Sequence, residues 1–370
     1  MNILIFGNRY FSINESIGSA FQQHGHLVQV LNYRDAWYPK IFCRNPIRRR
    51  RSVACFREIQ SGLKREIELA RPDVLFTLSG NVILPETLQW IRERGIVVVL
   101  LLLDSIHRLP LTQLGLEWYH LIYVFEPTDI PFISPKNANI AYLSPAYNPD
   151  FYHPIPGAEK KYDVTFVGTP YGQRLEILNQ LCKLALEKDI RVALVGKYWH
   201  RGYRKLAFRL SYPYIYRFVL KNGVMDPKNV NLLYNQSKVV LNHHIDINGE
   251  AVNCRLFDIA GAGALQLVEN RKILSETFRP GEEVVTYASV EELKAKADYF
   301  VKNPVEAQKI ANAAALRARA EHTYFHRSRR IIADISRVIA CDLPSHELSK
   351  REAVSTLFNS KNQKKAQHLQ

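Results

Sequence analysis

Residues Asn2–Gly7 read NILIFG, an almost unbroken apolar run that ends at a glycine. A segment with helical spacing of apolar residues follows from Ser16 to His24, and another apolar run follows at Leu27–Leu31. Runs without polar alternation are typical of strands that a parallel sheet buries on both faces. The stretch therefore predicts strand, loop, helix and strand, which is how a doubly wound α/β domain begins.

The same order of elements recurs along the chain in two series. The first series has further apolar runs at Pro72–Thr77, Ile96–Leu103, Leu121–Phe125 and Ile140–Leu143. The second series has them at Tyr162–Val167, Ile190–Val195, Val239–Asn242 and Ala264–Leu267, with helical segments such as Arg174–Glu187 between them. We therefore expect an α/β protein with two Rossmann-like, doubly wound domains.

Turn-forming residues mark the expected boundary between these domains. Pro149, Pro154, Pro156 and Gly157 break both periodicities within Asn148–Lys161. This predicts an N-terminal domain of residues 1–156 and a C-terminal domain of residues 157–340. Residues 341–370 have few large apolar side chains and predict a flexible tail. Helices are expected at Val290–Val301 and Pro304–Arg330, with Ile331–Ile339 extending the second one back toward the first domain.

The composition of the chain indicates the cellular compartment and the class of binding partner that we expect. The 370 residues are 47% hydrophobic, and Lys and Arg exceed Asp and Glu by 50 to 35, so the net charge of +15 favours an anionic partner such as a phosphate, a nucleic acid or a membrane surface. The five cysteines are odd in number and form no Cys-x-x-Cys pair, which favours a reducing compartment. No signal-peptide pattern opens the chain, and no apolar run approaches the ~20 residues of a membrane span. We expect a cytoplasmic protein.

Polar residues at a strand end of the second domain suit an anion. Gly168 and Thr169 follow the strand at Tyr162–Val167, and Arg174 comes six residues after the glycine, where a helix begins. A cation and free backbone N–H groups at such a place can hold a diphosphate together. The other interpretation is an arginine on the surface without a special role.

Two carboxylates stand eight positions apart further along. Glu250 lies beside a glycine, in the loop before a helix of small residues, and Asp258 lies near the start of that helix. Both can face one cleft, where one would reach a sugar hydroxyl and the other a ribose diol. By spacing alone, a solvated Glu250 and an Asp258 that merely favours the helix N-terminus explain the pattern as well.

Three motifs in order carry a resemblance. They are LNHHIDINGEAVNCRLFDIAGAGA at Leu241–Ala264, FRPGEEV at Phe278–Val284 and EHTYFHR at Glu321–Arg327. Between about Tyr162 and Ile339 the chain resembles the CgeB or spore-maturation-protein-like group of GT-B glycosyltransferases. The resemblance implies a GT-B fold, in which two Rossmann-like domains face a central cleft.

The resemblance also implies roles for single residues. Glu250 would face the transferred sugar as a catalytic residue, and Asp258 would hold the ribose, although the usual residue there is Glu. Gly168, Thr169 and Arg174 would lie near the diphosphate. Arg255 would either add charge to this site or pair with Asp258 structurally.

The implied activity is transfer of a sugar from a nucleotide diphosphate sugar to a glycan or lipid-linked acceptor, with retention and without a metal or another cofactor. The alternative is a catalytically weakened GT-B relative that acts as a structural or glycan-binding protein. No Asp-x-Asp occurs in the chain, which disfavours the Mg²⁺ or Mn²⁺ site of a GT-A transferase, and the adjacent His243 and His244 cannot chelate one metal together.

Carboxylates in the first domain and a pair near the C-terminus are further candidates. Asp104 and Glu126 follow neighbouring strands, so either could position or deprotonate the acceptor hydroxyl as a catalytic residue. A helix-capping Asp104 and a solvated Glu126 are equally compatible with the sequence. His322 and Arg327 are expected to pack and to bridge the domains.

One stretch of the second domain is rich in basic and aromatic residues. Residues 190–225 contain eight Lys or Arg and no Asp or Glu, interleaved with aromatic residues. This composition suits peripheral contact with an anionic membrane surface, here the inner face, or with an anionic acceptor. It equally suits a buried insertion with a solvated basic edge. Stacking on single-stranded nucleic acid uses the same residue types, but no recognisable nucleic-acid module is present, and we expect no nucleic acid as partner.

Overall fold

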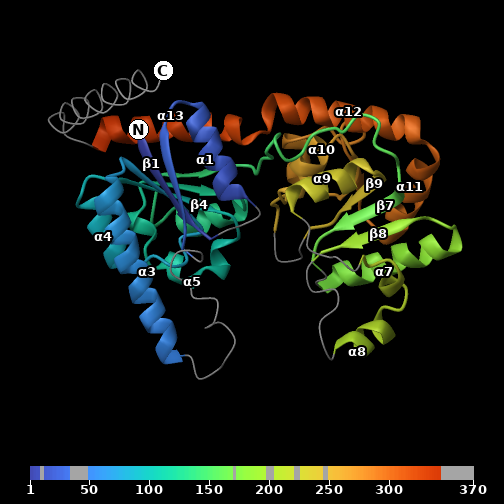
Figure 1. Cartoon of the computed structure of the whole chain (residues 1–370), viewed down its shortest axis with the longest axis horizontal. Coiled ribbons are helices and arrows are strands. Elements are labelled where there is room, and N and C mark those ends of the chain that lie inside the picture. Colours follow the sequence, from blue (N-terminus) through green and yellow to red (C-terminus); the bar gives the residue numbers. More distant parts are fainter. Residues whose placement is uncertain are drawn as a thin grey trace, which may run out of the picture.

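The structure is a computed structural model, and it describes residues 1–8, 12–33, 49–169, 172–196, 204–220, 226–244 and 249–342. The chain forms two α/β lobes joined by one connecting segment and by the last two helices (Figure 1). Each lobe is built on a parallel sheet. The predicted fold class is therefore confirmed.

The first sheet has six strands in the order β2-β1-β3-β4-β5-β6. Its strands β3 and β4 are buried along their whole length, as the apolar runs predict. The strands are β1 (Asn2–Gly7), β2 (Leu27–Asn32), β3 (Val74–Leu78), β4 (Val97–Leu102), β5 (Leu121–Val124) and β6 (Ile140–Tyr142). The helices of this lobe are α1 (Ile13–Gln23), α3 (Arg49–Ala70), α4 (Pro85–Arg92), α5 (Pro110–Gln113) and α6 (Ile130–Ile133), with short 3-10 turns η2 (Ile106–Arg108), η3 (Leu116–Trp118) and η4 (Pro127–Asp129).

The second sheet has five strands in the order β11-β10-β9-β7-β8. The sequence did not predict β11, because its three residues alternate in burial and form no apolar run. The strands are β7 (Tyr162–Val167), β8 (Val192–Val195), β9 (Ser237–Asn242), β10 (Leu265–Glu269) and β11 (Val285–Tyr287). The helices of this lobe are α7 (Gly172–Glu187), α8 (Arg204–Ser211), α9 (Pro227–Asn235), α10 (Arg255–Gly261), α11 (Val290–Lys302) and α12 (Pro304–Glu321), with η5 (Ile215–Arg217) and η6 (Lys272–Glu276). The last helix of the described chain is α13 (Tyr324–Asp342).

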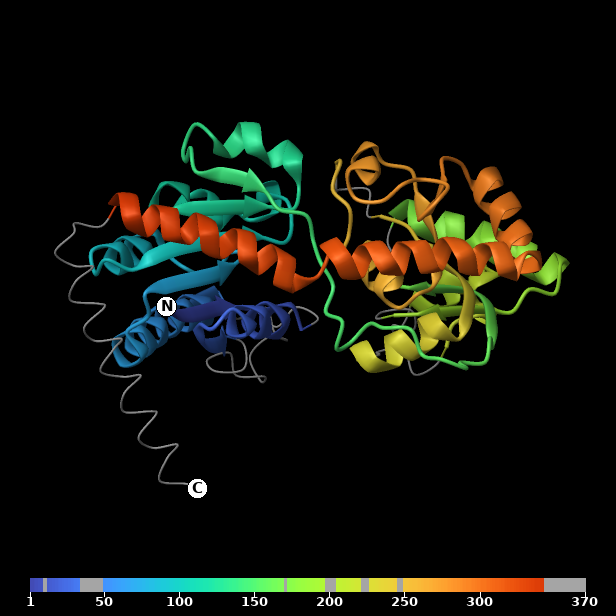
Figure 2. The ribbon, with the colours of Figure 1, turned by 90° about the horizontal axis from the view of Figure 1, so that it is seen from above.

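The long C-terminal helix that the sequence predicts is broken in two. It ends at Glu321, and α13 begins at Tyr324 and runs on across the first lobe, packed against α1 (Figure 2). The break has a cause in the connecting segment. Tyr147 N–H donates to His322 O at 3.1 Å, and Tyr324 N–H donates to Tyr147 O at 3.2 Å, so backbone from another segment replaces two hydrogen bonds of a continuous helix. The described chain thus ends on the first lobe, where α13 contacts α1.

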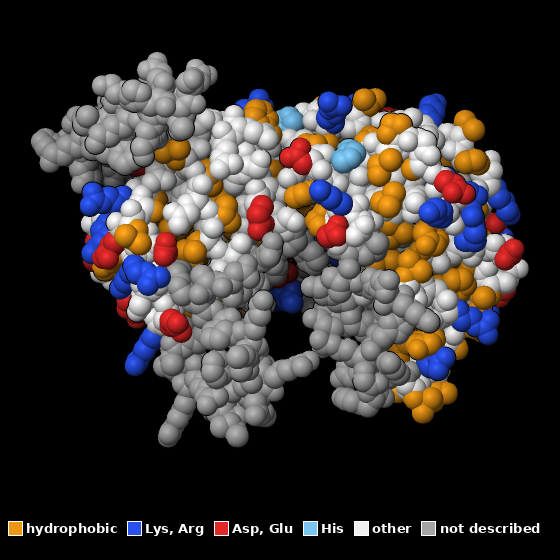
Figure 3. All heavy atoms as spheres, viewed as in Figure 1, with side chains coloured by type: hydrophobic (Ala, Val, Ile, Leu, Met, Phe, Trp, Pro, Cys, Tyr) orange, Lys and Arg blue, Asp and Glu red, His pale blue; other side chains and the backbone are white. Residues whose placement is uncertain are grey.

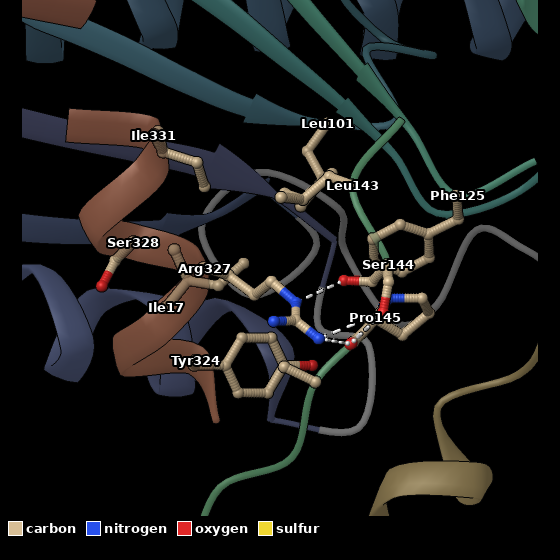
Figure 4. A pocket seen from close by; sticks show the side chains of 11 residues that line it. Ile17, Leu101, Phe125, Leu143, Ser144, Pro145, Tyr324, Arg327, Ser328 and Ile331 are labelled. Carbon is tan, nitrogen blue, oxygen red and sulfur yellow. Dashed lines mark hydrogen bonds between the residues drawn. The ribbon is translucent and has the colours of Figure 1, made fainter. Parts of the chain in front are cut away.

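Arg327 fixes the beginning of α13 to the connecting segment. Its guanidinium donates to Ser144 O at 2.9 Å, to Pro145 O at 3.1 Å and to His322 Nδ1 at 2.9 Å, beside a small apolar pocket (Figure 4). The ring of His322 also contacts Thr277 O at 2.9 Å through Nε2. The predicted packing and bridging role of these two residues is confirmed.

The order of the strands locates the place where each sheet can bind a ligand. In the second sheet β7 lies between β8 and β9, so the chain passes from β7 to β8 on one side and then returns past β7 to β9 on the other. Ligands of open α/β sheets bind at such a switch point, beyond the carboxyl ends of the strands. In the second lobe these ends are the residues after Val167 and after Asn242. Within the described residues, no helix is both long and apolar enough to cross a membrane.

Candidate functional site

Arg174 ties together the two strand ends at the switch point of the second sheet. It lies in the first turn of α7 and is 3% exposed. Its Nη1 donates to Thr169 O, beyond β7, at 2.7 Å, and its Nη2 donates to His243 O, beyond β9, at 2.8 Å. The structure thus places this cation at the predicted end of the sheet, but buried between two loops rather than on the surface.

Gly168 allows this close arrangement. A Cβ atom at Gly168 would lie 2.7 Å from Cζ of Phe166 and 3.6 Å from Nη1 of Arg174. The guanidinium carbon of Arg174 in turn lies 5.3 Å from the centre of the Phe166 ring. Gly168, Thr169 and Arg174 are therefore brought together, as predicted, because a side chain at the strand end would displace the ring on which the guanidinium rests.

A buried polar cluster stands beside them that the sequence analysis did not assemble. His243 Nδ1 and the Tyr287 hydroxyl lie 2.9 Å apart, and His244 Nδ1 lies 3.4 Å from Glu269 Oε2. Burial lowers the pKa of His244 to about 4. Burial alone would raise the pKa of Glu269, but the contact with His244 and the charges of His243 and Arg271 outweigh it and lower this pKa to about 2. No sequence pattern joins these residues, because they lie at the carboxyl ends of three different strands, β9, β10 and β11.

The segment that carries both candidate carboxylates is fixed at its middle. Val252 is 2% exposed, and the Asn253 side chain accepts a hydrogen bond from Leu256 N–H at 3.2 Å and donates one to Asn242 Oδ1 at 2.8 Å. Asn253 thus caps the start of α10 and joins it to the end of β9. The Gln266 side chain donates to Leu256 O at 2.9 Å and secures the same turn from β10.

The two carboxylates have different surroundings. Glu250 is exposed in a loop, whereas Asp258 lies partly buried in the first turn of α10. Burial raises the pKa of Asp258 to about 8, although the charge of Arg255 lowers it somewhat. Within the described residues, neither carboxylate accepts a hydrogen bond or forms an ion pair. The structural pairing of Arg255 with Asp258, one of the two interpretations of that arginine, is not formed.

In the first lobe, Asp104 follows β4 and Glu126 follows β5, but the two carboxylates differ in exposure and in their hydrogen-bond partners. Asp104 is half exposed and pairs with Arg108 at 3.0 Å, while Ser105 rather than Asp104 caps the following turn. Burial and the charge of Asp258 raise the pKa of the Cys254 thiol to about 12, and the charge of Asp104 adds to this rise. Asp104 therefore lies near the segment with the two candidate carboxylates.

Glu126 is not the solvated or acceptor-facing group that the sequence suggests. It is 4% exposed, and its Oε1 accepts hydrogen bonds from Thr128 Oγ1 at 2.8 Å and from Glu250 N–H at 3.2 Å. Its Oε2 accepts one from Ala251 N–H at 3.1 Å. The carboxylate is thus occupied by a loop of the other lobe, a contact across 124 residues of sequence that no spacing could indicate.

Residues of both lobes therefore meet at one place. Figure 3 shows the surface hollowed between the two lobes, with acidic and basic side chains visible inside the hollow. The described residues contain no group of three or more His, Cys, Asp or Glu arranged to hold a metal ion. Residues 170–171 and 245–248, which follow Thr169 and His244 in the sequence, are not among the described residues.

Comparison with known proteins agrees with this arrangement. A family model described as glycosyl transferase-like matches residues 174–333. The spore protein CgeB of Bacillus subtilis (strain 168) is 24% identical over 313 aligned residues, which cover 77% of this chain and 88% of that protein. The resemblance that the three motifs carry is thereby confirmed.

Solved structures show the same fold at low identity. Sucrose-phosphate synthase from Thermosynechococcus elongatus has a TM-score of 0.70 at 11% identity, and the match covers 92% of this chain and 100% of that one. HepE from Anabaena, solved in complex with UDP-glucose, has a TM-score of 0.62 at 12% identity, with 91% and 100% covered. The chain thus has the GT-B fold, carries a glycosyl transferase-like domain and is similar to spore protein CgeB.

Proposed function

We propose that this protein is a retaining glycosyltransferase that moves a sugar from a nucleotide diphosphate sugar to a glycan or lipid-linked acceptor without a metal ion. The observation that carries the proposal is the switch point of the second sheet. There Arg174 joins the ends of β7 and β9, and the two carboxylates Glu250 and Asp258 follow β9 in the chain. The UDP-glucose complex of HepE, a protein of the same fold, supports a nucleotide sugar as donor.

The proposed roles follow from charge and burial. Arg174, with the backbone N–H group of Thr169, would stabilise the negative charge that develops on the leaving diphosphate. Gly168, whose own N–H donates to Val195 O at 2.8 Å, would contribute the space that its missing side chain leaves. Asp258 would accept hydrogen bonds from the ribose hydroxyls, since its carboxylate is desolvated and accepts none within the described residues. Arg255, which does not pair with Asp258, would add positive charge near the diphosphate.

Glu250 would orient the transferred sugar, and Asp104 would face the acceptor from the other lobe. In the transfer, the bond between the anomeric carbon and the diphosphate oxygen breaks, and a bond from the same carbon to the acceptor oxygen forms on the same face of the sugar. The acceptor proton passes to the departing diphosphate or to Asp104. No resident cofactor is needed for this chemistry.

A nucleotide panel tests the proposal. Uridine or guanosine diphosphate, or its glucose conjugate, is expected to raise the melting temperature by about 3 °C or more at a ligand concentration near 100 times Kd, because a ligand that binds only the native state stabilises it. The rise should be equal in EDTA and in Mg²⁺. Stabilisation that appears only with Mg²⁺ would contradict the metal-free mechanism, and no stabilisation by any nucleotide would contradict the function.

We further propose that α8 brings the enzyme to an anionic membrane surface, where a lipid-linked acceptor would be found. Leu206 and Leu210 are 68% and 74% exposed, and their spacing places them on one face of the helix. Phe208 and Tyr212 pack inward against the core of the second lobe. The guanidinium carbon of Arg209 lies 4.0 Å from the ring centre of Tyr216. Hydrophobic and basic side chains gather at this corner of the surface (Figure 3).

Sedimentation with vesicles tests the α8 surface. The protein is expected to bind phosphatidylglycerol vesicles more strongly than phosphatidylcholine vesicles, and Leu206→Glu with Leu210→Glu should weaken binding by about tenfold or more, because two apolar side chains no longer enter the interface. Leu316→Glu on α12 is the matched control, since Leu316 is 72% exposed elsewhere. Equal binding to both lipids, or equal losses in both variants, would exclude α8 as the membrane contact.

A further inference from the structure

Residues 249–251, the Glu250 loop, are held through their backbone. Glu250 is exposed, Gly249 has no side chain, and Ala251 is buried but has only a methyl group. Nothing in the described chain holds the Glu250 carboxylate itself. The direction in which Glu250 points therefore depends on the groups that bind the N–H and C=O groups of the loop.

The N–H groups of the loop bind a carboxylate of the first lobe. Glu126 accepts from Glu250 N–H at 3.2 Å and from Ala251 N–H at 3.1 Å, one bond on each oxygen. Thr128 orients this carboxylate, because its hydroxyl donates to Glu126 Oε1 at 2.8 Å. Burial alone would raise the pKa of Glu126, but the bonds from Thr128, Ala251 and Glu250 outweigh it and lower this pKa. Glu126 is thus held as an anion.

The C=O groups of the loop bind a cation of the second lobe. Arg271, just beyond β10, donates from Nη1 to Gly249 O at 2.7 Å and to Ala251 O at 3.1 Å. Its Nη2 donates to Glu269 Oε2 at 3.4 Å, and this second contact helps to hold the guanidinium in place. The N–H groups of the loop therefore bind the negative charge of Glu126, and its C=O groups bind the positive charge of Arg271. Hydrogen bonds in which one partner is charged are about twice as strong as hydrogen bonds between neutral groups.

Close packing at the glycine supports the same arrangement. A Cβ atom on Gly249 would lie 3.3 Å from Thr128 Oγ1 and 3.4 Å from Glu126 Oε1. The first distance is slightly shorter than usual for a Cβ atom and the second is at the limit of ordinary van der Waals contact, so a side chain at Gly249 would require Thr128 to move by a few tenths of an ångström. The loop is thereby confined by packing as well as by polar contacts.

We propose that Glu126 and Arg271 are positioning residues that aim Glu250 at the transferred sugar. The inference rests on the proposed function and adds to it residues on both lobes that act through the loop rather than on the donor. A misplacement of a catalytic group by about 1 Å can cost about 100-fold in rate. Loss of either charged partner would free the loop and produce such a misplacement.

Calorimetry with UDP and with UDP-glucose, or with the guanosine pair if the panel favours it, tests the proposal. Glu126→Gln keeps the size of the side chain but sets an amide NH₂ against a backbone N–H. We expect the Kd for UDP to change by less than about twofold, the affinity for UDP-glucose to fall about tenfold, and UDP release from UDP-glucose to slow by about 10- to 100-fold. Arg271→Lys should show the same selective loss.

A milder variant and a control separate positioning from folding. Thr128→Val removes the hydroxyl that orients Glu126 and should give a smaller loss of the same kind, which Thr128→Ser should restore. Asp163→Asn is the control, because Asp163 is also a buried carboxylate with a pKa lowered to about 2, bonded to Arg191 and Lys238, but it lies at the opposite end of β7. It should lower the melting temperature and leave the discrimination between UDP and UDP-glucose unchanged.

Each outcome has a distinct meaning. Equal weakening of UDP and UDP-glucose in Glu126→Gln, or no change in a folded variant, would overturn the positioning role. If Glu126→Gln does not fold, Thr128→Val decides in the same way. A wild-type protein that binds neither nucleotide would instead contradict the proposed function on which the inference rests.

Discussion

Glu250→Gln is expected to reduce sugar transfer by about 100-fold or more while the Kd for the nucleoside diphosphate stays within about twofold. The reason is that Glu250 is exposed in a loop and its proposed partner is the sugar, which the free nucleotide lacks. Turnover is measured as release of the nucleoside diphosphate from its sugar conjugate, and affinity is measured by calorimetry. The variant should fold normally, because the Glu250 carboxylate forms no hydrogen bond in the described chain.

A suitable control for this loss is Glu276→Gln, a substitution of the same kind elsewhere on the exposed surface of the second lobe. It should leave both turnover and affinity unchanged. If Glu250→Gln weakens the nucleoside diphosphate and the nucleotide sugar equally, Glu250 does not act on the sugar.

Asp258→Asn is expected to stabilise the ligand-free protein by an amount that grows between pH 4 and pH 8, on the order of a few kcal/mol at the upper end. The pKa of Asp258 is raised from 3.8 to about 8 by burial. Between these two values the unfolded chain has released its proton and the folded chain retains it, so the carboxyl group lowers stability progressively as pH rises. Asn has no such group, and the difference in melting temperature should level off above about pH 8.

The same substitution should weaken nucleotide binding, since the ribose loses its acceptor. In the wild type, the ionised carboxylate would accept the ribose hydroxyls, so binding should release a proton near pH 7 and strengthen as pH rises toward 8. Calorimetry in buffers of different ionisation enthalpy measures that proton. A difference in melting temperature between wild type and Asp258→Asn that does not change with pH would contradict the raised pKa of Asp258. A nucleotide affinity that Asp258→Asn leaves unchanged would remove Asp258 from the ribose site.

The sequence predicted the strands well, because burial on both faces of a parallel sheet leaves runs without polar alternation. It missed β11, which is only three residues long, and it joined α12 to α13, because the break between them comes from Tyr147 in another segment. Neither error reflects a misread local propensity. The first arises because so short a strand leaves no apolar run, and the second arises from a tertiary contact that a window of sequence does not contain.

The candidate site was predictable to the extent that it follows strand ends. Gly168, Thr169 and Arg174 come together as expected, because a parallel sheet brings the residues beyond its strands to one edge. That Arg174 binds two backbone carbonyls could not be foreseen, nor could the bonds from Glu126 to the Glu250 loop. Backbone groups carry no residue identity, so their partners leave no motif.

Amide hydrogen exchange of the protein saturated with nucleotide tests the central claim most directly, because it locates the donor. With the nucleotide sugar that stabilises the protein most, in EDTA, exchange should slow in peptides that cover residues 168–174 and 249–263. The Asp163 end of β7 should be unaffected and serves as an internal reference. Unchanged exchange in both peptides, under conditions where calorimetry shows the protein to be saturated, would contradict a donor site at the switch point of the second sheet.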